Sequence, residues 1–299
     1  MRSRSPLFSF PGAVAASALF LAAAACPADT VSIGASKDNV LFQMSDNSQV
    51  SNALSPHLVV GQTNSLLLRR AAIEFDVAGA IPAGSTVTAV ELQMEMTRTI
   101  AGAQNVSLHV CQAEWGEGTS NDPRPGGEGA EATPGDVTWT NRFFPGDPWT
   151  TPGGDFGPAR ATTSVDGIGQ YIWSSQGLVE DVQAWLDNPS SNHGWIMTGV
   201  ETGDLPTAKR FASRQAEDPA TRPVLIVDYT PPPGCDSIDF NGDGLFPDNQ
   251  DIQDFFDVFG GGACSTGTCN DIDFNNDGLF PDNADLEAFF SVFGGGNCL

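Results

Sequence analysis

Hydrophobic and polar residues alternate in many short runs between residues 30 and 230. The run 90–96 is the clearest, because valine, leucine or methionine fills every second position and glutamate or glutamine fills the positions between them. A period of two predicts an antiparallel strand with one buried face and one wet face. Similar runs, separated by turn residues, predict strands at residues 30–33, 39–43, 57–60, 70–75, 85–96, 106–112, 194–199 and 224–229.

One segment has a helical period instead. In residues 177–188 the apolar side chains of Leu178, Val182 and Trp185 recur at spacings of three and four, and an Asn-Pro pair follows. This pattern predicts an amphipathic helix that ends before the proline. Many short strands with a single helix predict a mainly β domain over residues 29–230, an antiparallel β-sandwich of jelly-roll type.

The pattern changes after residues 231–234, a Pro-Pro-Pro-Gly run that we interpret as a short stiff linker. Residues 235–264 and 269–298 align without a gap at an offset of 34 and are identical at 21 of 30 positions. Each unit has a polar loop, then apolar residues at helical spacing, then three glycines that stop a helix. The sequence therefore predicts a small tail, 235–299, of two loop–helix repeats.

The strongly acidic composition of the chain limits the partners that it can bind. The chain has 37 Asp and Glu against 13 Lys and Arg, a net charge of −24. Nucleic acid is excluded as a partner, because phosphate binding needs clustered basic residues. The tail has 13 acidic residues and no Lys or Arg, so we expect a divalent cation to neutralise it.

The cation ligands are predicted from an Asp-x-Asn-x-Asp-Gly motif in each repeat. Oxygen side chains at alternating loop positions converge on one hard cation, the glycine allows the turn, and a backbone carbonyl adds a ligand. The usual twelfth position holds no carboxylate, but the next position holds an aspartate, so the loop is longer by one residue. The predicted ligands are Asp239, Asn241, Asp243, the carbonyl of Leu245, and Asp251, then Asp273, Asn275, Asp277, the carbonyl of Leu279, and Asp285.

Residues 1–28 have the layout of a secretory signal peptide, with two arginines, a short apolar run and small residues. Cleavage after Ala25 or after Ala28 fits, and lipidation of Cys26 is an alternative. The apolar run is too short for a comfortable membrane span, and no other stretch qualifies. We therefore expect a protein that is secreted or held at the cell surface, with no transmembrane span in the mature chain.

Four of the six cysteines lie in the tail, and an exported chain keeps such cysteines as disulfides. Four cysteines allow three pairings. Equal spacing in the two repeats favours Cys235–Cys264 and Cys269–Cys298, while a crossed pairing across residues 265–268 remains open. Cys111 has no evident partner and is expected to be a buried thiol.

The tail resembles a dockerin, and more closely the variant dockerins with Gly-Cys endings at the carboxyl end of many exported bacterial proteins. The resemblance rests on the two tandem loops and covers about 65 residues. It implies folding that depends on calcium, with about two ions, and docking on a cohesin-type receptor module. The receptor contacts that it implies are Asp248, Asn249, Asp282 and Asn283.

The large domain resembles the DNRLRE family, which is grouped with carbohydrate-binding modules. The matching segments are 69–76, 81–87, 114–118, 137–139, and 185–188 followed by 194–195. The resemblance implies a polysaccharide or cell-surface glycan as partner, and some relatives bind acidic polysaccharides.

Candidate sugar contacts lie in the Gly- and Pro-rich region 137–154 and at a separate Lys-Arg pair. Trp139 and Trp149 offer rings for stacking, and Arg142, Lys209 and Arg210 are scarce cations for a uronate. Alternatively, the rings cover one end of the core and the Lys209–Arg210 pair makes a surface salt bridge.

Catalysis is the weaker interpretation. His57, His109 and His193 form no metal or nucleophile motif, whereas Glu114 and Glu117 flank a Trp-Gly pair and could act as paired carboxylates. The sequence thus predicts a secreted, non-catalytic protein. The alternatives are a polysaccharide lyase or glycoside hydrolase anchored by the same tail, and a structural exoprotein without a glycan site.

Overall fold

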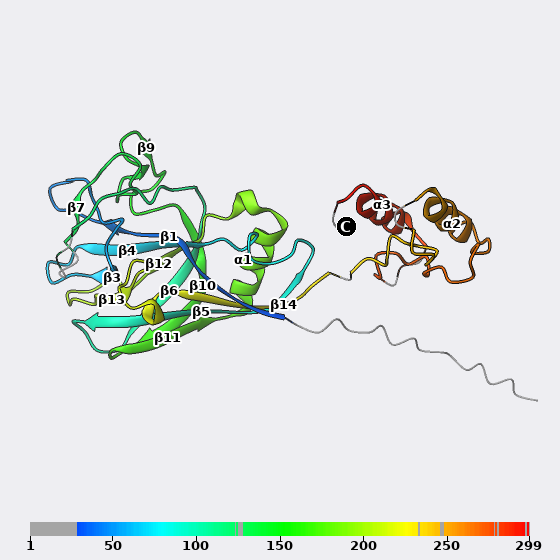
Figure 1. The fold of residues 1–299 in the computed structure, drawn as a ribbon. Helices are drawn as coiled ribbons and strands as arrows, with labels where there is room; N and C mark the ends of the chain where they lie inside the picture. Colours follow the sequence, from blue (N-terminus) through cyan, green and yellow to red (C-terminus); the bar gives the residue numbers. More distant parts are fainter. Residues whose placement is uncertain are drawn as a thin grey trace, which may run out of the picture.

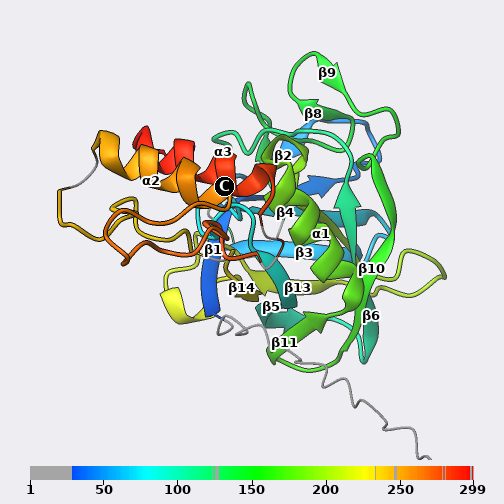
Figure 2. The same ribbon diagram turned by 90° about the vertical axis from the view of Figure 1, so that its right-hand side faces the viewer.

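The structure is a computed structural model. It describes residues 29–122, 124, 128–232, 234–245, 248–277, 279, 281–296 and 298. The predicted signal peptide and Cys26 lie outside the described residues. Figures 1 and 2 show a β-rich domain followed by a small helical tail, as the hydrophobic pattern predicts.

Six strands of the large domain close into a ring, in the order β1, β14, β5, β13, β3, β4 and back to β1. All pairings in this ring are antiparallel. The first part of β1 pairs with β14, and after a shift between Ala35 and Lys37 its second part pairs with β4. The six are β1 (Asp29–Phe42), β3 (His57–Gln62), β4 (Leu68–Phe75), β5 (Thr86–Thr99), β13 (Lys209–Ala212) and β14 (Val224–Thr230).

Further strands extend the ring on both sides. The strands β12 (Trp195–Thr198), β6 (Gln104–Cys111) and β10 (Phe156–Val165) continue the sheet beyond β4, and β11 (Gly169–Ser174) pairs with β5. Two small pairs lie apart: β2 (Val50–Ser51) with β7 (Ala130–Glu131), and β8 (Asn141–Phe143) with β9 (Asp147–Pro148).

The core of this domain follows the alternation. In β5 the side chains of Val90, Leu92, Met94 and Met96 are buried, while those between them are partly exposed. They pack with other apolar side chains of the core, including Trp173 on the neighbouring strand β11, so the predicted division of this strand into two faces is confirmed.

The predicted helix is α1 (Gln176–Asp187), and its start and end are as expected. The Ser175 hydroxyl caps it by accepting the Leu178 N–H, which satisfies one of the free donors of the first turn. Trp185 lies against Trp195 with ring centroids 4.5 Å apart. The helix therefore anchors its apolar face in the domain core, and the 3₁₀ turn Pro189–Ser191 follows it. A second 3₁₀ turn is Pro219–Thr221.

All eight predicted strand segments are strands, although 30–33 and 39–43 belong to the single strand β1. Three longer strands were missed, namely β10, β11 and β13. Much of β10 is exposed or half-exposed and carries Ala, Thr and Ser where an apolar face would be expected. Its pairing with β6 comes from tertiary context, which sequence periodicity does not contain.

The tail consists of α2 (Asn249–Phe259) and α3 (Asn283–Phe293), each preceded by a loop. Asp248 and Asp282 cap the two helices, each in a capping box with the aspartate three residues later. The rings of Phe255 and Phe289 stack with centroids 4.0 Å apart, so the two helices meet through equivalent residues. Each repeat thus supplies half of one apolar core, and the predicted helices are confirmed.

Asp38, which is buried in β1, should make the stability of the large domain depend on pH. Burial raises the pKa of Asp38 to about 7, although a hydrogen bond from the Arg214 N–H opposes the shift. Because the folded pKa exceeds the unfolded value of about 3.9, this group's contribution to stability is complete below about pH 4 and is lost as the pH rises through 7. We therefore compare the unfolding free energy of the Asp38→Asn variant with that of the natural chain. The difference in favour of the variant should be larger at pH 8 than at pH 4 by about 2–4 kcal/mol.

Urea unfolding of the full chain at both pH values measures this difference. The matched control is Asp204→Asn, at an exposed loop position, which should leave the pH dependence unchanged. An equal change for both variants would contradict the assignment to Asp38.

Among the described residues, no helix has the length and apolar character needed to cross a membrane.

Candidate metal loops and a groove on the large domain

The first loop of the tail folds its oxygen side chains around its own backbone. The Oδ1 atoms of Asp239 and Asn241 both lie 3.0 Å from the Asp243 amide nitrogen, and Asp239 Oδ2 lies 2.9 Å from the Gly244 nitrogen. Asp243 Oδ1 accepts the Leu245 N–H at 2.8 Å. Gly244 has a φ of +78°, a conformation that the motif's glycine permits. The three side chains of the motif are therefore drawn together at one turn.

The second loop repeats this arrangement. Asp273 Oδ1 and Asn275 Oδ1 lie 3.0 and 3.1 Å from the Asp277 amide nitrogen. Asp277 Oδ1 accepts the Leu279 N–H at 2.7 Å. The two loops, whose sequences differ at one position between residues 238–249 and 272–283, thus place these oxygens beside the same backbone amide.

The extra residue in each loop has a structural explanation. Asp251 is the third residue of α2, and its side chain turns back toward the start of the helix. Its Oδ2 accepts the Asp248 N–H at 2.9 Å, and its Oδ1 lies 3.5 Å from the Asn241 nitrogen. Asp285 makes the equivalent contacts, at 2.9 and 3.4 Å. Both carboxylates are fully buried. The predicted closing ligands thus lie against the loops they were expected to close.

The residues of the loops fit a hard cation. Each loop offers three carboxylates, one amide oxygen and a backbone carbonyl, which is the oxygen-only donor set that calcium prefers. Within the described residues, no three His, Cys, Asp or Glu side chains are arranged as ready metal ligands. A buried carboxylate such as Asp251 is costly without a compensating charge, and the tail sequence contains no Lys or Arg.

The four predicted receptor contacts lie at the two helix starts. Asp248 and Asp282 are half-buried caps, so their oxygens are engaged. Asn249 and Asn283 are exposed and remain available for contact with a partner.

All four tail cysteines form disulfides, but the predicted pairing is wrong. The bonds are Cys235–Cys298 and Cys264–Cys269. The reason is that the two repeats pack against each other. The Asp236 N–H donates to the Phe274 carbonyl, so the first residues of the first repeat lie beside the second repeat. Equal spacing in the sequence carries no information about this exchange.

Cys111 is a buried free thiol, as predicted. Burial raises its pKa to about 11, which keeps it protonated and unreactive near neutral pH.

The two tryptophans proposed for sugar stacking do not form one exposed platform. Trp149 is buried, donates its Nε1–H to the Thr138 carbonyl at 3.1 Å, and packs in a small second core. Trp139 is half-buried, with the Arg70 guanidinium 4.9 Å from its ring centroid. For Trp149 the alternative, that the ring covers the core, is therefore correct.

Of the three proposed cations, Lys209 and Arg210 line one pocket of about 300 Å³, and Arg142 is not among its lining residues. Lys209 is buried, and its ammonium donates to Thr99 Oγ1 and to three backbone carbonyls. It therefore holds chain turns together. Arg210 lies opposite Arg98 across β13 and β5, and Arg142 lies over the Phe143 ring, 5.8 Å from its centroid.

Sequence reasoning missed a groove of about 610 Å³ on the large domain. Its walls carry the hydrogen-bonding side chains of Gln112 and Asp155 and the ring of Phe156. Arg70 lies in the same wall, 5.0 Å from the Phe156 centroid, and Glu201 fixes its guanidinium with two hydrogen bonds of 2.8 and 2.7 Å. Polar groups beside an aromatic face are what a sugar ring requires.

The paired carboxylates considered for catalysis have different surroundings. Glu117 forms an ion pair with Arg214 and accepts the Asp38 N–H at 2.9 Å. Glu114 is exposed. Glu117 thus has a clear structural role in joining three segments of the chain.

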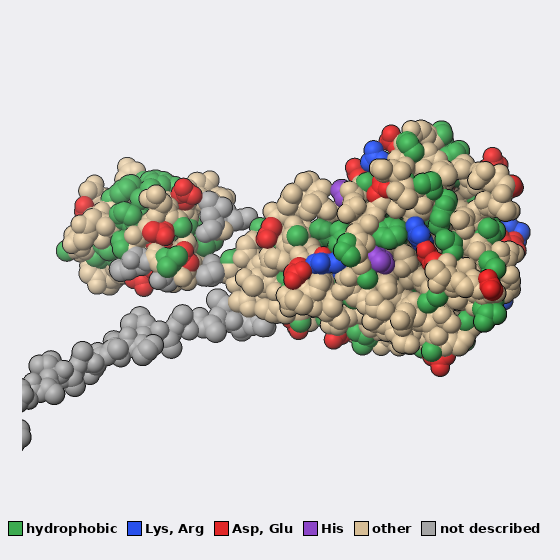
Figure 3. Space-filling model, turned by 180° about the vertical axis from the view of Figure 1, so that it is seen from behind, with side chains coloured by type: hydrophobic (Ala, Val, Ile, Leu, Met, Phe, Trp, Pro, Cys, Tyr) green, Lys and Arg blue, Asp and Glu red, His purple; other side chains and the backbone are tan. Residues whose placement is uncertain are grey.

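No protein-family model matches this chain, and no curated protein matches its sequence. Figure 3 shows acidic side chains on both parts of the molecule, with basic side chains visible only on the large domain.

Proposed function

We propose that this protein is a secreted, non-catalytic adaptor whose tail binds two calcium ions and docks on a cohesin-type receptor. The observation that carries the proposal is the repeated loop geometry, in which the same oxygen side chains converge at the same backbone position in both repeats. A docking role also accounts for two exposed phenylalanines on the helices. Phe256 and Phe290 are 44% and 43% exposed, with ring centroids 5.9 Å apart.

Binding of the full chain to immobilised cohesin modules tests the docking role. Surface plasmon resonance should show binding in millimolar calcium and none after chelation. Replacing Asn249 and Asn283 by Ala should weaken it without changing calcium uptake. Binding that persists in chelator would contradict calcium-dependent docking.

A second function, supported by the groove, is the binding of a polysaccharide by the large domain, which we propose is of jelly-roll type. Gln112, Asp155 and Phe156 all line this groove. Replacing Phe156 by Ala should lower retention on a bound polysaccharide about tenfold, because the loss of the stacked ring removes about 1.4 kcal/mol of contact free energy. Affinity electrophoresis against a polysaccharide panel measures this.

The control for this prediction is Ile172→Ala on β11, where a residue with 42% exposure lies outside the groove. Equal loss in both variants would contradict the groove as the binding site. Release of reducing ends or unsaturated products from the same panel would favour the lyase or hydrolase instead.

A further inference from the structure

The two repeats differ in what holds the asparagine of each loop. In the first repeat, Asn241 Nδ2 donates to Asp254 Oδ2 at 3.2 Å. The equivalent of Asp254 in the second repeat is Ala288. There, Asn275 Nδ2 donates to Asp277 Oδ2, at 3.1 Å, within its own loop. The first asparagine is thus held from outside its loop and the second from inside.

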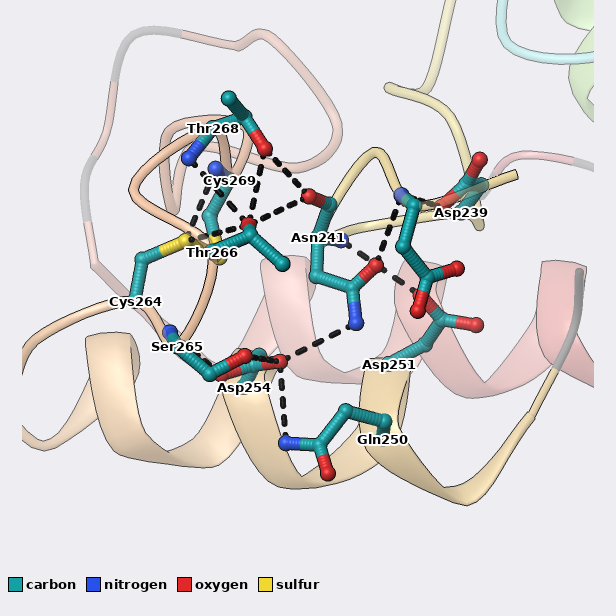
Figure 4. The surroundings of a disulfide bond; sticks show 11 residues. Asp239, Asn241, Gln250, Asp251, Asp254, Cys264, Ser265, Thr266, Thr268 and Cys269 are labelled. Carbon is teal, nitrogen blue, oxygen red and sulfur yellow. Dashed lines mark hydrogen bonds between the residues drawn. A yellow bond between two sulfur atoms is a disulfide. The ribbon is translucent and has the colours of Figure 1, made fainter. Parts of the chain in front are cut away.

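A short disulfide-closed segment provides the outside support. The Cys264–Cys269 bond closes residues 265–268 into a small loop that lies on the first calcium loop (Figure 4). The hydroxyls of Thr266 and Thr268 both donate to the Asn241 carbonyl, at 2.6 and 2.7 Å.

The same segment also holds Asp254. The N–H and hydroxyl of Ser265 donate to the Asp254 carboxylate at 2.8 and 2.7 Å, and Gln250 Nε2 adds a bond of 3.1 Å. Asp254 therefore accepts hydrogen bonds from Ser265 and Gln250 while it also accepts the Asn241 amide, so its carboxylate has a fixed place beside the first loop.

This support fixes which way the Asn241 amide points. Because Nδ2 is bound to Asp254, Oδ1 must face the loop, where the expected ligands Asp239 and Asp243 lie. Asn241 is fully buried, so it has little freedom to turn. In the second loop, the Asn275 amide is instead bound to Asp277, itself an expected ligand. The side chain of Asn241 is therefore preorganised by groups outside its loop, whereas that of Asn275 is not.

We propose that the Cys264–Cys269 disulfide is a positioning element for the first calcium loop alone, which makes the first site the tighter of two unequal sites. The proposal rests on calcium binding by the tail. Opening the disulfide frees residues 265–268, so Thr266 and Thr268 no longer hold the Asn241 backbone and Ser265 no longer holds Asp254. The first site then loses its advantage and the second site is unaffected.

The test separates the two sites in the full chain. Asp273→Ala leaves only the first loop and Asp239→Ala leaves only the second. Cys264→Ser and Cys269→Ser are then added to each background. Calcium titration calorimetry should show an affinity about tenfold lower for the first loop, equivalent to about 1.4 kcal/mol, and no change for the second loop. With the disulfide intact, the Thr266→Val, Thr268→Val double variant should show the same loss of calcium affinity at the first loop. The corresponding Thr→Ser double variant should keep the affinity of the natural chain.

Circular dichroism at 222 nm shows whether the helices persist in each variant. An equal loss of affinity in both backgrounds, or no loss in the first loop, would overturn the proposal while calcium binding itself stands. Failure of the unaltered chain to bind calcium would overturn the proposed function and this inference together.

Discussion

Replacing Asp239 and Asp273 together by alanine is expected to abolish the stabilisation of the tail by calcium. Each is the first residue of its motif, and its Oδ1 lies beside the central amide of the loop. At a calcium concentration about a thousand times the dissociation constant, one site contributes about 4 kcal/mol to the folded state, so two sites contribute about 8 kcal/mol. Scanning calorimetry of the full chain, with calcium and with chelator, measures the shift of the tail transition.

The matched control for this double variant is Glu287→Ala. Glu287 is exposed on α3 and lies outside both loops, so its loss removes one negative charge without removing a ligand. It should keep the whole calcium effect, whereas each single aspartate variant should keep about half. A double variant that calcium still stabilises fully would show that these aspartates are not ligands.

Removing the Cys235–Cys298 disulfide should destabilise the tail about twice as much as removing Cys264–Cys269. The first bond spans 63 residues of sequence and the second spans 5. If a disulfide acts by restricting the unfolded chain, loops of these lengths correspond to about 4 and about 2 kcal/mol. Urea unfolding of the two double Cys→Ser variants of the full chain, in calcium, gives both totals. For Cys264–Cys269, the loss of calcium affinity at the first loop, about 1.4 kcal/mol, is subtracted before the two are compared.

Cys111→Ser serves as the control for cysteine chemistry, because that thiol is buried in the large domain and should leave the tail transition unchanged. Peptide mapping under non-reducing conditions checks the pairing directly. Recovery of a peptide that links Cys235 to Cys264 would contradict the pairing in the structure.

The sequence predicted much of the fold because its signals are local. The alternation in β5 and the spacing of Leu178, Val182 and Trp185 in α1 each depend on neighbours within one element. The strand β13 was missed because only four residues form it and its pairing with β3 and β5 joins distant segments. Closure of the strand ring through β1 is likewise a property of the whole sheet.

The sequence likewise predicted those features of the candidate sites that depend on local sequence, and not those that depend on tertiary contacts. The loop ligands were predicted because a short motif sets their geometry, and Asp251 takes up its position as part of a local capping box. The disulfide pairing was not predictable, since it depends on how the two repeats meet. The burial of Trp149 and Lys209 was not foreseen, because residue type does not reveal burial, and each satisfies its polar group inside the domain. The groove at Gln112 and Phe156 joins separate strands and loops, so no local pattern marks it.

The central claim is that each loop of the tail holds one calcium ion. Isothermal titration of the full, disulfide-intact chain with calcium tests it most directly, because it counts ions without assuming a receptor. We expect about two calcium ions per chain, with magnesium a poor substitute because it demands a tighter octahedral shell. Uptake of less than one calcium ion per chain would contradict the claim.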